Sequence, residues 1–133
     1  MASYDVLWQL LYGALALAFV GMGIVHFAPA PARGMARMIP PRMRGRGLVS
    51  PEALVAFTGV CEIAGGIGLL VPPLRVAAAI ALAVFLVAVF PANAYAAKHP
   101  GTFGRAAIAF WPRLAAQLVL IAVLLAIALV GPR

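Results

Sequence analysis

Four long apolar runs constrain this sequence more than any other feature. Charged residues, proline or glycine bound each run. A helix needs ~20 apolar residues to cross the ~30 Å hydrocarbon core of a bilayer, and a helix satisfies its own backbone hydrogen bonds there. We therefore predict an all-α fold, a four-helix transmembrane bundle that forms one domain over residues 1–133. The predicted spans are residues 7–27, 52–71, 75–97 and 112–130.

The composition indicates that lipid is the solvent of these helices. Apolar residues make up 65% of the chain and charged residues only 10%, whereas charged residues make up about 25% of a typical soluble protein. So short a chain cannot bury this much apolar surface in one core that water surrounds. We expect a multi-pass protein of the inner cell membrane.

The charged residues are distributed unevenly. Ten basic residues and three acidic ones give a net charge of +7. Such a balance can indicate nucleic-acid binding, but basic loops lying against anionic lipid headgroups explain it better in so apolar a chain. The first and third loops carry eight basic residues against two on the other side, which predicts cytoplasmic loops and both termini outside. The eight are Arg33, Arg37, Arg42, Arg44, Arg46, Lys98, Arg105 and Arg113; the two are Arg75 and Arg133.

The first loop, residues 28–51, differs from the others in kind. Its arginines alternate with apolar residues, among them Met35, Met38, Ile39 and Met43. This pattern is typical of a segment that lies in the headgroup layer with its apolar side chains toward the acyl chains. A solvated basic loop that only sets the topology explains the pattern equally well.

Each predicted helix carries one polar residue within the span or near its end: His26, Glu62, Asn93 and Gln117. Glu62 lies ten residues into the second span, near the middle of the membrane, where an acid costs about 2.5–3.5 kcal/mol to insert. The other three lie nearer the basic side. We therefore expect a polar funnel that opens to the cytoplasm.

Glycines surround Glu62 on its own helix. Gly59 precedes it by one turn, and Gly65 and Gly66 follow it by one turn. Glycine on a helix face lets another helix approach closely, so Glu62 is predicted to point into the bundle. The span itself begins at Ser50, Pro51 and Glu52, a typical N-cap, first-turn proline and first-turn acid.

Two interpretations of these polar residues remain open. In the first they are structural, hydrogen-bonding across helices and fixing helix order, with Glu62 protonated or paired with His26 or Arg113. In the second they form a pocket that handles protons or binds a polar headgroup, since histidine titrates near neutrality. The predicted pocket residues are His26, Glu62, Asn93, Gln117 and Arg113.

Motifs for independent catalysis are missing from the sequence. The single cysteine, Cys61, cannot cycle as a dithiol. Zinc spacing, a phosphate-binding glycine loop and a nucleophile elbow are all missing, and the two histidines have no ligand-like neighbours. We predict no metal site and no catalytic residues, and expect that the protein is not an enzyme on its own.

Short motifs occur in order along nearly the whole chain. They are Gly23-Ile24-Val25-His26-Phe27 with Pro29, Met38-Ile39-Pro40-Pro41, Gly59 with Glu62-Ile63 and Gly65-Gly66-Ile67-Gly68-Leu69-Leu70, Ala88-Val89-Phe90-Pro91-Ala92-Asn93, and Arg113 with Gln117. Together they resemble the DoxX family of small four-helix membrane proteins. The resemblance implies a four-helix transmembrane fold, a link to quinone oxidation or to oxidative stress, and recurrent polar positions at His26, Glu62, Asn93 and Gln117.

These observations lead to two main hypotheses. The first is a redox-associated accessory subunit that binds a quinone-like or lipid headgroup in the polar pocket, with electrons supplied by a membrane redox partner. The alternative is a non-enzymatic membrane scaffold or assembly factor, for which the small-residue faces also make a homo-oligomer plausible. A proton-coupled conduit is a third hypothesis, but the outer half of the bundle offers almost no polar side chains. Nucleic acid is not an expected partner.

Overall fold

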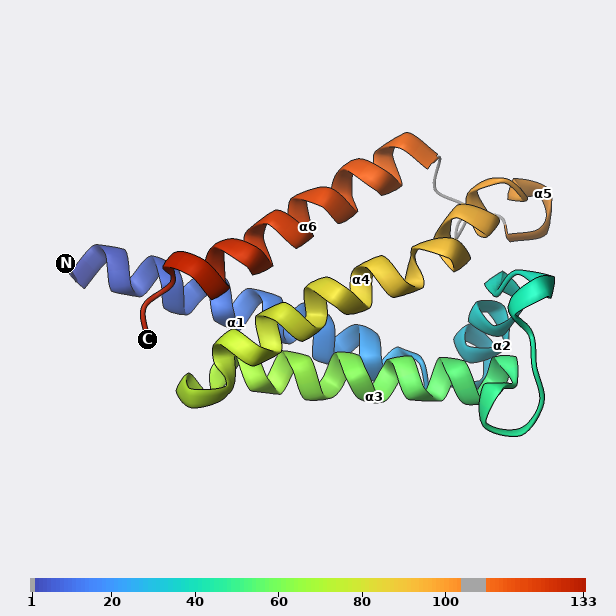
Figure 1. Cartoon of the computed structure of the whole chain (residues 1–133), viewed down its shortest axis with the longest axis horizontal. Helices are drawn as coiled ribbons and strands as arrows, with labels where there is room; N and C mark the ends of the chain where they lie inside the picture. Colours follow the sequence, from blue (N-terminus) through green and yellow to red (C-terminus); the bar gives the residue numbers. More distant parts are fainter. Residues whose placement is uncertain (1, 104–109) are drawn as a thin grey trace.

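The computed structural model describes residues 2–103 and 110–133, which are all-α and contain no strand (Figure 1). Short 3₁₀ turns connect the α-helices: η1 (Pro41–Met43), η2 (Gly47–Val49) and η3 (Pro72–Leu74). The α-helices are α1 (Ala2–Val25), α2 (Pro29–Met38), α3 (Pro51–Leu70), α4 (Arg75–Ala97), α5 (Pro100–Phe103) and α6 (Phe110–Val130).

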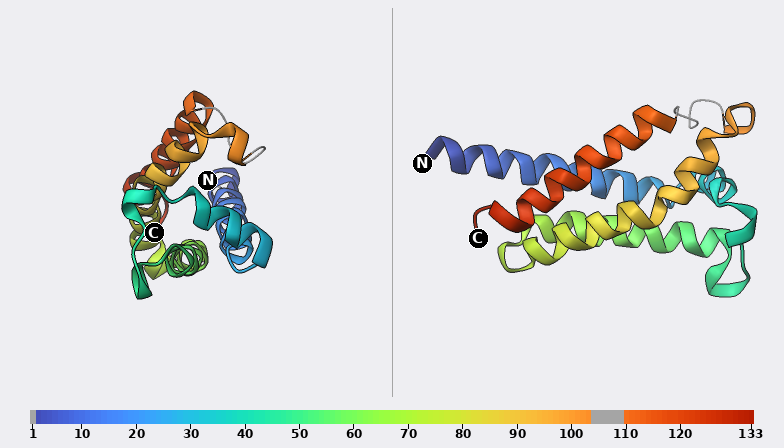
Figure 2. Two further views of the ribbon diagram at one scale, coloured as in Figure 1. Left: turned by 90° about the vertical axis from the view of Figure 1, so that its right-hand side faces the viewer. Right: turned by 45° about the horizontal axis from the view of Figure 1, so that its top comes forward.

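Four of these helices, α1, α3, α4 and α6, are long and apolar enough to cross a membrane. The prediction of four long helices is therefore confirmed. Contacts run from α1 to α3, from α3 to α4 and from α4 to α6. Both termini lie at one end of the molecule, and α2 and α5 lie at the other (Figures 1 and 2). The three residues of η3 join α3 to α4, so these two helices form an antiparallel hairpin.

The main apolar core lies toward the end that holds the termini. Its largest fully buried side chains come from all four long helices: Tyr12, Leu69, Leu82, Leu124 and Ile127. Toward the opposite end, α6 diverges from α1 and α3 and stays beside α4 (Figures 1 and 2). The four helices therefore share one core at the terminal end, while the basic end is more open.

The contact between α1 and α3 depends on glycine. A Cβ atom added at Gly23 of α1 would lie 2.7 Å from the carbonyl oxygen of Gly59 on α3. One added at Gly66 would lie 3.1 Å from the carbonyl oxygen of Ala16. Both distances are shorter than side chains normally tolerate, so the two backbones approach as closely as they do because these positions lack side chains.

The first helix extends beyond the predicted span at its N-terminal end. Helix α1 begins at Ala2, earlier than the predicted residue 7. The first turns carry aromatic residues one turn apart, and the ring centroids of Tyr4 and Trp8 lie 6.0 Å apart and those of Trp8 and Tyr12 5.8 Å apart. Such contacts support helix beyond the purely apolar part.

The structure also corrects the segment 28–51, which we predicted as a loop. Residues Pro29–Met38 form helix α2 instead. The prolines that we took as a stop signal lie in its first turn, where backbone N–H groups have no partner within the helix and proline is therefore tolerated. Ala36 and Ile39 pack against Val55 of α3, so this segment is part of the folded structure.

Arg75 is buried, although the sequence analysis counted it only as a basic residue on the outer side of the membrane. Its side chain is 6% exposed at the start of α4. The guanidinium lies 4.0 Å from the ring centroid of Tyr12, and its Nε donates to the carbonyl oxygen of Leu69 at 2.8 Å. Nη1 lies 3.5 Å from the carbonyl oxygen of Pro132. This side chain therefore joins α1, α3 and the C-terminal residues at the start of α4.

Alanine substitutions at two glycines of α1 test the close contact. Alanine is a better helix former than glycine by about 1 kcal/mol, and nothing lies within 4 Å of a Cβ at Gly21. Gly21→Ala should therefore leave the free energy of unfolding unchanged or raise it. Gly23→Ala should lower it by about 1–3 kcal/mol, because the methyl group overlaps the α3 backbone. Chemical unfolding in detergent micelles measures both, and equal effects would contradict the proposed contact.

Candidate functional site

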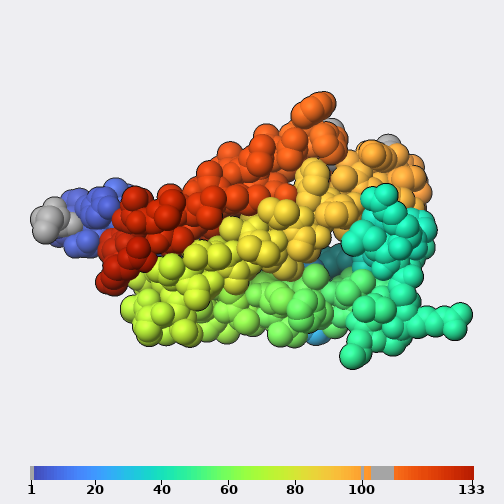
Figure 3. Space-filling model, viewed as in Figure 1, coloured from blue at the N-terminus to red at the C-terminus, as the bar shows by residue number. Residues whose placement is uncertain are grey.

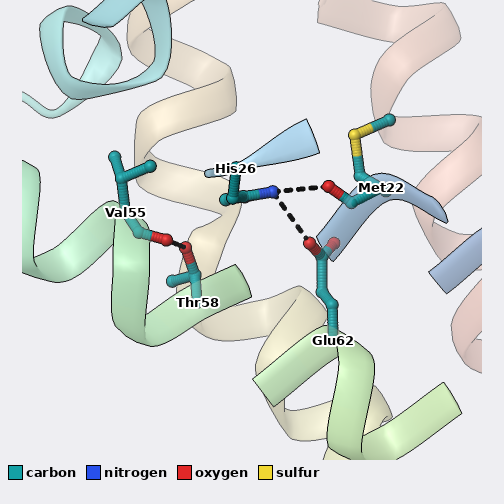
Figure 4. A network of polar contacts seen from close by, with 5 residues as sticks. All are labelled: Met22, His26, Val55, Thr58 and Glu62. Carbon is teal, nitrogen blue, oxygen red and sulfur yellow. Dashed lines mark hydrogen bonds and ion pairs between the residues drawn. The ribbon is translucent and has the colours of Figure 1, made fainter. Parts of the chain in front are cut away.

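His26 follows the C-terminal end of α1 and lies against α3. Its Nδ1 lies 2.8 Å from the carbonyl oxygen of Met22 and 3.1 Å from Oε2 of Glu62 (Figure 4). A backbone carbonyl oxygen only accepts hydrogen bonds, so this contact places a proton on Nδ1. The hydrogen bond to Met22 thus orients the imidazole ring with Nδ1 beside the Glu62 carboxyl group.

Glu62 lies on α3 and is 7% exposed, as its glycine neighbours predict. Oε2 is within ion-pair distance of His26, but no described residue forms a hydrogen bond with this oxygen. The hydroxyl of Thr58, one turn earlier, donates to the carbonyl oxygen of Val55 at 2.8 Å (Figure 4). Among the described residues, His26 is the one side chain within ion-pair distance of this carboxyl group, which is a weak arrangement for a buried acid.

A groove of about 490 Å³ lies next to this pair, between α2 and the first turns of α3. His26 lines it, together with basic side chains of α2 and of the segment that follows. Small apolar side chains line part of the groove: Ala32, Ala36 and Val55. Its charged lining residues are Arg33, Arg37, Arg44 and Glu52.

The arginines of this groove have different roles. Arg44 is held by backbone acceptors: Nε donates to the carbonyl oxygen of Ile39 at 2.9 Å, and Nη2 donates to that of Arg37 at 3.1 Å. It therefore fixes the return of the chain after α2. The side chains of Arg33 and Arg37 are exposed and form no hydrogen bond or ion pair with a described residue. Their guanidinium groups are available to a ligand in the groove.

The remaining predicted pocket residues form a second group. Arg113 of α6 donates from Nη1 to Oδ1 of Asn93 on α4 at 2.9 Å. Gln117 is buried one turn further along α6. No described hydrogen bond or ion pair connects Asn93, Arg113 or Gln117 to His26 or Glu62. These hydrogen bonds and ion pairs thus form two groups among the described residues, one on α1 and α3 and one on α4 and α6.

Two further sequence observations concern the basic end. Arg105, one of the residues in the orientation count, lies outside the described residues. His99 directs Nδ1 to the carbonyl oxygen of Tyr95 at 2.7 Å, at the end of α4. Within residues 2–103 and 110–133, no three histidine, cysteine or acidic side chains group as a metal site would require.

Sequence reasoning missed that Arg33 and Arg37 line a groove, because they entered only the charge count. They are four residues apart, a spacing that places side chains on one helix face. Ala32 and Ala36 have the same spacing and line the groove beside them. This signal was present, but the prolines at positions 29 and 31 led us to predict a loop.

Comparisons with known proteins test the family resemblance. A protein-family model matches residues 15–128. It is not the DoxX family, so the resemblance drawn from the short motifs is wrong. No curated protein and no solved structure matches the chain. The chain belongs to the family described as Domain of unknown function (DUF8561), whose model matches nearly its whole length.

Proposed function

We propose that this protein is a small multi-pass membrane protein that binds the polar headgroup of a lipid-like ligand. The binding site is the groove between α2 and α3. The observation that carries this proposal is that His26, next to the buried Glu62, and the unpaired Arg33 and Arg37 line one groove. Helix α2 packs beside the first turns of α3, and the ends of membrane-spanning helices meet the lipid headgroups.

The distribution of basic residues supports a cytoplasmic location for the end that holds α2. Basic residues gather at the end that holds α2, while both termini lie at the other end (Figure 1). In our proposal the basic end is cytoplasmic, following the positive-inside rule, and the membrane is the inner cell membrane. Anionic headgroups of the cytoplasmic leaflet then surround the groove.

The donors in the groove define the class of ligand. Arginine presents several N–H donors in a planar fork that suits phosphate or carbonyl oxygens. His26 adds a polar ring, and Glu52 is the one acid among the lining residues. A headgroup with hydrogen-bond acceptors, either a phospholipid phosphate or a quinone-like ring, matches this set. The redox role depended on the resemblance to DoxX, so the proposal is restricted to binding.

The unfavourable position of Glu62 also supports a functional role. A buried acid with one weak partner contributes little to stability, and an apolar side chain of similar size is often as stable or more stable there. The pair adjoins the groove through His26. We infer that Glu62 positions and polarises His26 for the ligand.

A scaffold is the second candidate, and the outer face of α1 favours it. Gly13 and Gly21 have open space where a side chain would lie, and they are two helical turns apart. Small residues at such spacing let a second transmembrane helix approach closely. In this alternative the partner is another copy of the chain or a different membrane protein.

Binding measurements with two variants test the ligand site. Arg33→Gln/Arg37→Gln should weaken retention of phosphatidylglycerol about 10- to 30-fold, from about 1 kcal/mol per cation, and should also weaken retention of decylubiquinone through the lost N–H donors. His26→Ala should also weaken it. The control, Arg46→Gln/Arg133→Gln, removes the same charge outside the groove and should have a smaller effect. Native mass spectrometry of the detergent-solubilised protein measures retention. Unchanged retention of both probes in both groove variants would overturn the proposal.

Unfolding measurements test the role of Glu62. Glu62→Met should leave the free energy of unfolding unchanged or raise it, since His26 keeps its hydrogen bond to Met22. His26→Ala should lower it by about 1–3 kcal/mol, because the Glu62 carboxyl group then loses its one polar neighbour. A large loss of stability in Glu62→Met would instead support a purely structural pair.

Co-purification distinguishes the scaffold from the binding protein. A scaffold should elute from mild detergent with a stoichiometric partner, either a second copy or another chain. Gly21→Leu should abolish that association, whereas Gly21→Ala, the smaller change, should weaken it less. A monomer that retains lipid and no protein partner would contradict the scaffold.

A further inference from the structure

A second groove, of about 540 Å³, lies between the turn after α2 and the last turns of α4. It shares no lining residue with the His26 groove. The two segments that form it, teal and orange in Figure 3, stand next to each other at the basic end of the molecule. Its lining residues include Pro40, Pro41, Arg42, Pro91, Ala94 and Lys98.

The floor of this groove is apolar because the sequence places proline and alanine there. Pro40 and Pro41 come from the turn, and Pro91 and Ala94 lie one turn apart on α4. Proline has no backbone N–H, so the three prolines offer no amide donor to a polar ligand. The floor therefore suits a hydrocarbon chain.

The rim of the groove is positively charged. Arg42 and Lys98 are exposed, and neither forms an ion pair with a described residue. The three acids of the chain, Asp5, Glu52 and Glu62, do not line this groove. The protein therefore supplies no acidic side chain in this groove to neutralise the two cations.

We propose that this groove binds one anionic phospholipid, with its phosphate between Arg42 and Lys98 and an acyl chain on the proline and alanine floor. Lys98 directly follows α4, which is the depth at which lipid phosphates meet the ends of transmembrane helices. Charge complementarity selects an anionic headgroup, and the apolar floor selects a lipid over a free phosphate.

Single substitutions test the charged rim. The protein in detergent is titrated with phosphatidylglycerol or phosphatidylcholine, and bound lipid is counted by native mass spectrometry. Arg33→Gln/Arg37→Gln serves as the background so that the other groove contributes little. Arg42→Gln and Lys98→Gln should each weaken phosphatidylglycerol binding about fivefold. Arg46→Gln, the matched control on the same segment, should have less than half of that effect. Equal effects of all three substitutions would show that binding depends only on general surface charge and would overturn the proposed site.

A substitution on the floor separates a lipid from a free anion. Ala94→Leu keeps every charge and fills the floor, so it should reduce phosphatidylglycerol binding at least as strongly as Arg42→Gln. Inorganic phosphate should not displace the lipid at a concentration equal to that of the lipid. Unchanged binding in Ala94→Leu, displacement by phosphate, or equal binding of phosphatidylcholine would each overturn the proposal. Binding of an acidic peptide in place of the lipid would overturn it as well.

Discussion

The close contact between α1 and α3 is the constraint on which the candidate site depends. Gly23 and Gly59 bring the two backbones together, and His26 lies one turn after Gly23 while Glu62 lies one turn after Gly59. The same interface therefore brings the imidazole to 3.1 Å from the carboxyl group. Side chains at either glycine would separate the helices and with them the pair. Packing and polar chemistry are coupled at this point of the fold.

The groove depends on this contact through a second step. Since α1 ends beside the first half of α3, the chain must turn back, and α2 covers the N-terminal part of α3. Ala36 and Ile39 pack on Val55, whereas Arg33 and Arg37 remain exposed. An amphipathic helix thus places its arginines at the rim of a groove whose inner end is His26. Arg44 stabilises this arrangement through two backbone carbonyl groups.

Strong local signals made much of the fold predictable. Length and apolarity identified the four long helices, and Ser50 caps α3 as predicted, with its Oγ accepting from the N–H of Ala53 at 3.2 Å. The glycines around Glu62 predicted its burial. Pairings between helices were not predictable, because hydropathy does not say which faces meet. The resemblance to DoxX failed for a related reason: glycine and isolated polar residues in apolar helices reflect packing needs that unrelated membrane bundles share.

The main apolar core and the two grooves lie at opposite ends of the molecule. At the terminal end, buried Arg75 links α1, α3 and the C-terminal residues, and the main apolar core lies toward the same end. At the basic end, α6 diverges from α1 and α3 (Figure 2). Both grooves lie there, between short, arginine-bearing segments and the long helices. The short segments that form one side of each groove contribute no residue to the main apolar core. In the proposed function, a ligand at the basic end would meet α2 and its neighbouring turns, while the long helices share their core at the other end.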